Sequence, residues 1–426
     1  MRVTTLLAIV LGLKKTKVVS ASVEDMGIVI DVKPTARVPY CSGCLRAVRP
    51  VHDKRERFWR HLDLAGMQLK LRYALRRVDC KRCGTCVELV PWADPGSWFT
   101  YDFEEHVAYL AQTADKTTVA DTMRVSWRTV GSIVERVVAR FRPGNPLDGL
   151  RRIGIDELSY RKNHEYVTVV IDHDRKRVVW ACPGRDAATL AEFFRELGPE
   201  RCAQIEAVTL DMSGAYVKAV TDAGLAEKMI FDRFHVEKLS HAALDEVRRA
   251  EVREKKGTEE GAVLKRGRYI LLKCPWNLTA IETQKLSMMQ KANKPIYRAY
   301  LLKETLADIL DNHDPDVARI KLTEWIGWAQ RSRLEPFKKL AGTIQQHFEG
   351  ILAYIPERLN NGRTEGMNGK IRTITRRSFG FHGPSNLIAL IFLCCSGIDL
   401  QPVFKFALAG DQVDRGRVPR GALNHR

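Results

Sequence analysis

The sequence predicts a chain of several units, in which a mixed α/β core follows a small cysteine-rich module and a helix-turn-helix. Three observations support this fold class. Five of the ten cysteines lie within residues 41–86, the apolar spacing changes from helical to strand-like after residue 149, and residues 236–355 contain no strand-like run. A chain of 426 residues is long enough for roughly two to four domains with separate cores.

The composition favours a polyanionic partner. Lys and Arg (69) exceed Asp and Glu (51) by 18, which fits nucleic acid or an anionic membrane surface. A membrane span needs about 20 apolar residues, and the runs Val3–Leu13 and Leu387–Cys395 are shorter. Three lysines directly after Val3–Leu13 stand where a signal peptide has small, uncharged residues. The remaining cysteines are scattered in apolar surroundings, so we expect the protein in the reducing cytoplasm. Because the apolar runs are short, we expect no membrane partner.

The N-terminal module is predicted to hold one structural Zn²⁺. Residues 1–40 predict short strands such as Gly27–Val32, and two Cys-x2-Cys pairs separated by 35 residues then follow. Each pair can present two thiolates to one tetrahedral ion. The four predicted ligands are Cys41, Cys44, Cys80 and Cys83. Cys86 is an alternative to Cys83, and Gly43 and Gly84 fit a backbone that turns tightly around the sulfurs. A redox pair is disfavoured because the motif occurs twice.

The next segment predicts a helix-turn-helix. A short helix over Thr118–Arg124 precedes a break, after which Ser126 is placed to cap a longer helix. The apolar positions of this longer helix define one buried stripe: Val130, Ile133, Val134, Val137, Val138 and Phe141. We expect Trp127, Arg128 and Thr129 in the exposed first turn, the part of a recognition helix that contacts base edges. The alternative is a plain helical connector, and the basic net charge favours DNA binding.

After the linker at residues 142–149 the sequence predicts an α/β sheet. Strands are expected at Arg152–Leu158, Tyr166–Asp172, Arg177–Cys182, Ile205–Leu210 and Lys228–Phe231, with a helix at Asp186–Leu197. Asp156 lies in the first strand, and Asp211 ends the fourth just before Ser213, which is placed to cap a helix. Side chains alternate along a strand, so we expect Glu157 on the face opposite Asp156 and only one of the two beside Asp211.

A third carboxylate opens a predicted helix near the C-terminus. Glu365 follows a turn at residues 360–362, and a helix is expected from about Thr364 to Arg377, before an apolar helix near Asn386–Cys395. Glu365, Asn368 and Arg372 recur at helical spacing on one face. A basic track that follows Glu365 is expected to contact DNA: Lys370, Arg372, Arg376 and Arg377.

The order of several strings resembles one family. The strings GIDELSYRKNHEYVTVV, PGRDAATL, TLDMSGAYVKA, DRFHVEKL and NGRTEGMNGKIRTITRRSFGF follow the double Cys-x2-Cys and cover almost the whole chain. They resemble the transposases of the ISL-three family of bacterial insertion sequences. The resemblance places the DDE catalytic triad on Asp156, Asp211 and Glu365. Asp232 and His235 resemble an accessory element found after the second Asp in several DDE groups, and a strand-end and helix-cap pair is the alternative.

This resemblance implies an RNase H-like catalytic core with a large all-α insertion. We therefore divide the chain into a zinc-binding module (1–97), a helix-turn-helix (98–146), the first part of the core (147–235), the helical insertion (236–355), the completing part with Glu365 (356–400) and a basic tail (401–426). The expected partner is double-stranded DNA, bound in the bacterial cytoplasm by a homodimer or larger assembly.

The resemblance also implies the chemistry. Three oxygen ligands suit two Mg²⁺ or Mn²⁺ ions, which would support cleavage at the transposon ends and joining of the 3′-hydroxyls to target DNA. Two alternatives remain. A zinc and helix-turn-helix transcriptional regulator would leave the three carboxylates without a role, and an RNase H-like nuclease would lack strand transfer.

Overall fold

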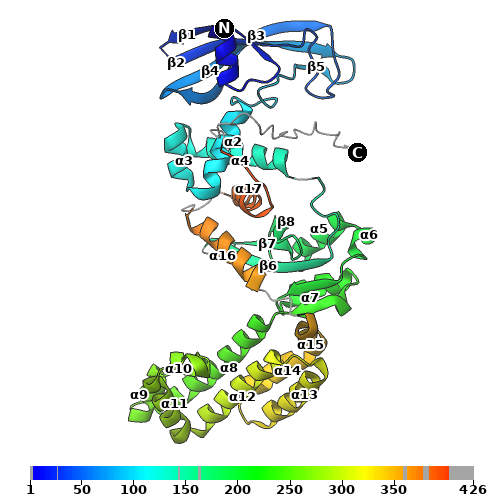
Figure 1. Cartoon of the computed structure of the whole chain (residues 1–426). Coiled ribbons are helices and arrows are strands. Elements are labelled where there is room, and N and C mark those ends of the chain that lie inside the picture. Colours follow the sequence, from blue (N-terminus) through cyan, green and yellow to red (C-terminus); the bar gives the residue numbers. More distant parts are fainter. Residues whose placement is uncertain are drawn as a thin grey trace. The chain divides into compact units, whose positions relative to one another are not determined.

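The computed structural model describes residues 3–25, 27–142, 144–161, 165–357, 362–377 and 383–402, without the side chains at positions 161, 362–365 and 368. The predicted turn at residues 360–362 falls largely outside these ranges, as does most of the tail. The chain divides into two compact units (Figure 1), residues 1–141 with the segment from Ile398, and residues 142–397. The division falls at the start of the predicted linker. No helix within the described ranges is long and apolar enough to cross a bilayer.

The first unit contains a five-stranded sheet in the order β1-β2-β4-β3, with β5 paired to β4. Its strands are β1 (Thr16–Glu24), β2 (Gly27–Pro34), β3 (Val51–Leu64), β4 (Met67–Cys80) and β5 (Gly84–Val87). The expected strand at Gly27–Val32 is confirmed as β2. Residues Val3–Val10 instead form helix α1, where short strands were expected. The long β3–β4 hairpin buries Trp59, whose ring packs edge-on against Trp92 at 5.5 Å.

Three helices follow the sheet in the same unit. They are α2 (Tyr101–Thr113), α3 (Lys116–Met123) and α4 (Trp127–Phe141). Thr100, the N-cap of α2, is hydrogen bonded to the buried His61 of β3 at 2.8 Å. Arg124, between α3 and α4, is hydrogen bonded to Asp63 of β3. The zinc-type module and the helix-turn-helix therefore pack together in one unit.

A buried carboxylate holds α2 against α4. Glu104 is fully buried and accepts hydrogen bonds from Arg136 Nε at 2.7 Å and from Arg140 at 3.2 Å. The predicted apolar stripe of α4 is buried except at its last position. Phe141, where the helix ends, is 36% exposed. The stripe prediction was therefore wrong for Phe141 alone.

The second unit is built on a five-stranded mixed sheet in the order β10-β9-β6-β7-β8. Its strands are β6 (Arg152–Arg161), β7 (Glu165–Asp172), β8 (Arg177–Pro183), β9 (Ala207–Leu210) and β10 (Met229–Phe231). Strand β7 is antiparallel to both β6 and β8, whereas β9 is parallel to both β6 and β10. All five strands lie where the apolar spacing predicted them.

Helices cover both faces of this sheet. Trp180 of β8 packs against Phe193 of α5 (Ala187–Leu197), and Thr168, on the same face of the sheet, is hydrogen bonded to Tyr216 of α7 (Gly214–Asp222), so these helices cover one face. The short α6 (Pro199–Cys202) and the 3-10 turn η1 (Ala226–Lys228) connect these elements. Helix α16 (Gly362–Arg377) packs on β6, and α17 (Pro384–Cys395) packs on β8.

Within the described part of the chain, the region expected to be helical contains eight α-helices between β10 and α16. They are α8 (Arg233–Glu254), α9 (Glu259–Arg266), α10 (Arg268–Leu272), α11 (Ala280–Ala292), α12 (Lys294–Asp311), α13 (Pro315–Arg331), α14 (Glu335–Gln346) and α15 (Phe348–Glu357), with the 3-10 turn η2 (Pro275–Asn277). Helix α15 returns to the edge strand β10, where a Cβ at Gly350 would lie 2.6 Å from the Phe231 ring. The helical region therefore shares its core with the sheet.

Replacing the buried Glu104 tests the contact between α2 and α4. We expect Glu104→Gln to lower the free energy of unfolding by about 2 kcal/mol, because two arginines lose a charged hydrogen-bond acceptor. Chemical denaturation of the full chain measures this change. Glu56→Gln, the same substitution at an exposed position of β3, should stay within about 0.5 kcal/mol. Equal effects of the two substitutions would contradict a structural role for Glu104.

Candidate functional site

Two predicted carboxylates are brought together by the pairing of β6 with β9. The strands are parallel, and Gly154 is opposite Thr209 in their register. Continuing this register by two residues aligns Asp156 with Asp211, which follows β9 directly. A two-residue step also keeps both side chains on the face that they share with Gly154 and Thr209. The structure thus brings Asp156 and Asp211 together on neighbouring strands.

The surroundings of Asp156 disfavour its charged form. Burial raises the pKa of Asp156 above its usual value, and the negative charge of Asp211 raises it further. The backbone N–H of Glu157 donates to Asp156 Oδ1 at 2.7 Å and acts in the opposite direction, as do the charges of His235 and Arg372. A cation bound at this position would therefore be stabilised by both carboxylates.

Asp211 is held at the start of helix α7. The backbone N–H of Ser213 donates to Asp211 Oδ1 at 3.0 Å. Ser213 occupies the N-cap position but makes no capping hydrogen bond with its side chain, contrary to the sequence expectation. The carboxylate of Asp211 therefore bonds one of the free N–H groups near the helix start, where the helix dipole favours a negative charge.

Glu157 extends the carboxylate cluster on the other face. It is paired with Thr168 across β6 and β7, and Thr168 Oγ1 lies 2.8 Å from the hydroxyl of Tyr216 on α7. Burial raises the pKa of Glu157, and the charge of Asp211 raises it further. The expectation that only one of the neighbours Asp156 and Glu157 would lie near Asp211 was therefore too strict. Asp211 stands at the strand end, where both faces meet.

Tyr216 was not among the predicted site residues. Its side chain is fully buried, and burial raises its pKa, as do the charges of Glu157, Asp211 and Asp156. The signal in the sequence was the position of Tyr216, five residues after Asp211 and inside the helix that follows strand β9. Arg185, whose charge lowers the pKa of Glu157, was also missed. Its guanidinium lies 4.1 Å from the centre of the Tyr166 ring.

Asp232 and His235 lie at the start of α8. Asp232 is the N-cap, and its side chain accepts a hydrogen bond from the backbone N–H of Phe234 at 3.2 Å. His235, in the first turn, is close enough for its charge to act on Asp156. Asp232 thus has the capping role that was the structural alternative, whereas His235 joins the carboxylate cluster.

Helix α16 brings the third predicted carboxylate and the basic track. Glu365 lies in its first turn, and its side chain is outside the described residues. Arg372 is seven residues further along, on the same face of the helix, and its charge acts on Asp156. Lys370 Nζ donates to the carbonyl of Cys394 on α17 at 2.5 Å. Arg372 and Arg376, two of the four residues in the track, are exposed. Neither forms a side-chain hydrogen bond or an ion pair with another described residue.

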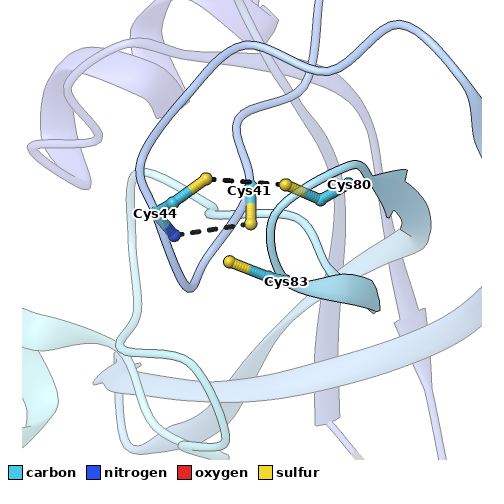
Figure 2. Close-up of side chains that lie close together, drawn as sticks. All are labelled: Cys41, Cys44, Cys80 and Cys83. Carbon is cyan, nitrogen blue, oxygen red and sulfur yellow. Dashed lines mark hydrogen bonds between the residues drawn. The ribbon is translucent and has the colours of Figure 1, made fainter. Parts of the chain in front are cut away.

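Four of the predicted zinc ligands converge in the first unit. One sulfur each from Cys41, Cys44, Cys80 and Cys83 lies within 4.8 Å of all the others, as Figure 2 shows. The backbone N–H of Cys44 donates to the Cys41 sulfur at 3.5 Å. At Gly43 a Cβ would lie 3.0 Å from the Cys83 sulfur, so a glycine fits this close approach without displacing the sulfur. Gly84 has a φ of +73°, which favours glycine.

The protonation of the thiols fits a metal site. Backbone N–H groups of Arg82 and Cys83 lower the pKa of Cys80 to about 6, which favours the thiolate that a metal binds. Burial and the neighbouring thiols raise the pKa of Cys83, a cost that a bound cation would relieve. The fifth cysteine, Cys86, has its sulfur 3.2 Å from Cys41 and stands outside the group of four.

The predicted DNA-reading turn begins α4. Ser126 caps the helix as expected, since its Oγ accepts from the backbone N–H of Thr129 at 3.1 Å. Trp127 is only partly exposed, because the ammonium of Lys116 lies 4.0 Å from the centre of its ring. Thr129 Oγ1 is also bonded to Ser126 at 2.8 Å. Arg128 is therefore the exposed member of the three.

Comparisons with known proteins agree with this arrangement. Residues 153–391 match the DDE transposase domain of the ISL3 family, residues 88–138 match the helix-turn-helix domain of transposase family ISL3, and residues 37–83 match the zinc-finger of transposase IS204/IS1001/IS1096/IS1165.

Two relatives align along most of their length. The chain is 40% identical over 364 residues to the transposase for insertion sequence element IS1557 of Mycobacterium tuberculosis, covering 80% of this chain and 82% of the relative. It is 28% identical over 364 residues to the transposase for insertion sequence element IS1001 of Bordetella parapertussis, covering 84% of this chain and 89% of the relative.

The matched domains and the site define a DNA transposase with a DDE domain, a helix-turn-helix and a zinc finger. More narrowly, the chain belongs to the ISL3 family of insertion-sequence transposases.

The cysteine geometry yields a test of the fourth zinc ligand. We expect Cys83→Ser to reduce bound zinc to less than about half an equivalent, because a three-thiolate site holds the ion more weakly. Cys86→Ser, the matched control, should retain about one equivalent because its sulfur lies outside the group of four that converge. Elemental analysis of the purified full chain after dialysis measures the zinc. Zinc loss in the Cys86 variant would assign the ligand to Cys86 instead.

Proposed function

We propose that this transposase binds the terminal inverted repeats of its insertion sequence, cuts at the transposon ends and joins the freed 3′-hydroxyls to target DNA. Asp156, Asp211 and Glu365 form the catalytic triad. The observation that carries the proposal is the parallel register of β6 and β9, which aligns the first two carboxylates. The action of Arg372 on Asp156 supports Glu365 as the third, because α16 carries both residues on one face.

An RNase H-like core is the fold that we propose for the sheet unit. Three antiparallel strands followed by two parallel ones, in the order β8-β7-β6-β9-β10, support it. In this interpretation the helices α8 to α15 are an insertion between the last strand and the helix that carries Glu365.

Divalent cations fit the proposed site. The like charges of Asp156 and Asp211 raise the pKa of Asp156, and carboxylate oxygens suit Mg²⁺ or Mn²⁺. Asp156, Asp211 and Glu365 would hold two such ions, which activate the attacking oxygen and stabilise the leaving 3′ oxygen when bound. Tyr216 and Thr168 support the strand ends from the opposite face through their 2.8 Å hydrogen bond.

DNA recognition is assigned to the first unit and to α16. Arg128 is exposed in the first turn of α4, where a recognition helix contacts base edges. Arg372 and Arg376 are placed to contact phosphates near the carboxylates. The other four predicted DNA-binding residues contact neighbouring groups of the protein: Trp127, Thr129, Lys370 and Arg377. Their proposed role is to position the exposed arginines of α16 and the first turn of α4. The active form on paired ends is proposed to be a homodimer or larger assembly.

Substituting one carboxylate tests the chemistry. We expect Asp211→Asn to abolish both end cleavage and strand transfer while binding to the transposon ends persists, because the proposed DNA-reading helix lies in the other unit. Assays with the element's own ends, uncut and precut with a free 3′-hydroxyl, measure the two steps. Joining of the precut end by the unaltered protein separates a transposase from a nuclease that lacks strand transfer.

Glu157→Gln is the matched control for that experiment. Glu157 feels the charge of Asp211 but lies on the Tyr216 face of the sheet, so measurable cleavage should remain. Full activity of Asp211→Asn, or complete inactivity of Glu157→Gln in a folded protein, would contradict the proposed triad.

Base reading by α4 is tested at Arg128. We expect Arg128→Ala to weaken binding to the element's ends by about 1–3 kcal/mol more than binding to random duplex. Competition binding with the two DNAs measures the difference. Equal losses with a reduced salt dependence would instead show that Arg128 contacts phosphate.

A further inference from the structure

A separate part of the helical region carries most of its charge. Residues 255–294, which include α9, α10 and α11, form a segment that we call the basic lobe. It contains nine Lys and Arg residues against three Glu. The preceding helix α8 contains five of each sign, and residues 301–346 contain seven of each sign. The net positive charge of the helical region therefore comes from this one part.

Most of these cations are available to a partner. In the described ranges, Lys255 and Lys273 pair with glutamates of the lobe, and Arg268 pairs with Asp245. Six others are exposed and form no ion pair with a described carboxylate: Lys256, Lys265, Arg266, Lys285, Lys291 and Lys294. Such a surface attracts an anionic polymer and releases its counterions on binding.

Exposed apolar side chains lie among the cations. Tyr269 is 72% exposed and Trp276 is 70% exposed. On α11, Ile281, Lys285 and Met288 follow one another at steps of four and three residues, so they share one exposed face. Aromatic rings combined with unpaired cations fit nucleic acid, because bases stack on the rings while phosphates bind the cations. An apolar protein partner would not account for the six cations.

The lobe lies at a defined distance from the carboxylates. Helix α8 begins beside them, since its N-cap Asp232 follows Phe231, which is paired in parallel with Leu210 directly before Asp211, and it ends directly before the lobe. Its 22 residues span about 33 Å at 1.5 Å per residue. In Figure 1 the labels α9, α10 and α11 accordingly lie at the far end of α8 from the strand labels. This length equals roughly ten base pairs of duplex at 3.4 Å each.

We propose that the basic lobe is a second DNA-binding surface, which contacts phosphates about one duplex turn from the cleavage point and stacks Trp276 and Tyr269 on exposed bases. The DNA bound by the lobe is the same DNA whose strand is held at the catalytic carboxylates. This identification rests on the proposed function. The contact itself does not require cleavage, so it is measured without added Mg²⁺ or Mn²⁺.

Two charge variants of the full chain test the phosphate contacts. The lobe variant combines Arg266→Gln, Lys285→Gln and Lys291→Gln. The control combines Arg333→Gln, Lys321→Gln and Lys339→Gln, three exposed cations in the electrically balanced part of the helical region. Each removes three positive charges. Fluorescence anisotropy at several salt concentrations, with a transposon-end duplex that carries an unpaired flank, measures the slope of log affinity against log salt.

We expect the slope to fall by about two to three in the lobe variant, at about 0.9 per lost phosphate contact, and by less than about one in the control. Trp276→Ala alters an exposed residue, so it should fold normally and weaken binding by roughly fivefold or more. Equal slopes for the two charge variants would overturn the phosphate contacts, and unchanged affinity of Trp276→Ala would overturn the stacking. Loss of self-association in the lobe variant with unchanged DNA binding would replace DNA by a second copy of the chain.

These outcomes are separate from those of the proposed function. A protein that fails to cut DNA but shows the expected difference between the charge variants retains the lobe as a DNA-binding surface. A protein that cuts and joins with equal slopes in both variants retains the catalytic proposal and loses the lobe.

Discussion

The parallel pairing of β6 with β9 is the constraint on which the catalytic unit depends. It places two carboxylates on neighbouring strands, where their like charges oppose each other and burial disfavours ionisation of Asp156. Such an arrangement is stable only when positive groups surround it. The N-cap residue of α7, Ser213, contributes its backbone N–H to Asp211, α8 contributes His235 and α16 contributes Arg372. The starts of two helices near in sequence and a third helix from the C-terminal part of the unit therefore meet where this repulsion must be offset.

The helical region can be large because it leaves and re-enters the core at one edge of the sheet. Helix α8 begins directly after β10, and α15 packs back on β10, where Gly350 allows close contact with Phe231. Its helices bury residues in the same cluster as the sheet. The far end of α8 lies about 33 Å along the helix from the strand ends, whereas Gly350 lies directly against β10. This separation lets one domain combine a rigid site with a remote binding surface.

The sequence predicted best where one physical signal determines the structure. All five strands of the second unit follow from apolar spacing, and α4 follows from its apolar stripe and the cap at Ser126. Helix α1 was missed because a short apolar run has no decisive period. Phe141 was expected to be buried, because periodicity does not show where neighbouring elements cease to pack against a helix. The hydrogen bond of Tyr216 could not be predicted from its position after Asp211, since its partner Thr168 lies in another strand of the sheet.

The same contrast explains why Asp156 and Asp211 were predicted to lie together, whereas the action of Asp211 on Glu157 was not predicted. Alternation along β6 correctly separates Asp156 from Glu157, but it describes only side chains inside a strand. Asp211 lies just beyond β9, and its carboxylate turns toward the start of α7, so the charges of both neighbours reach it. A strand end is thus the place where two faces of a sheet share one electrostatic environment. Carboxylates at such ends gain access to groups from both layers of helices, which a residue in mid-strand does not have.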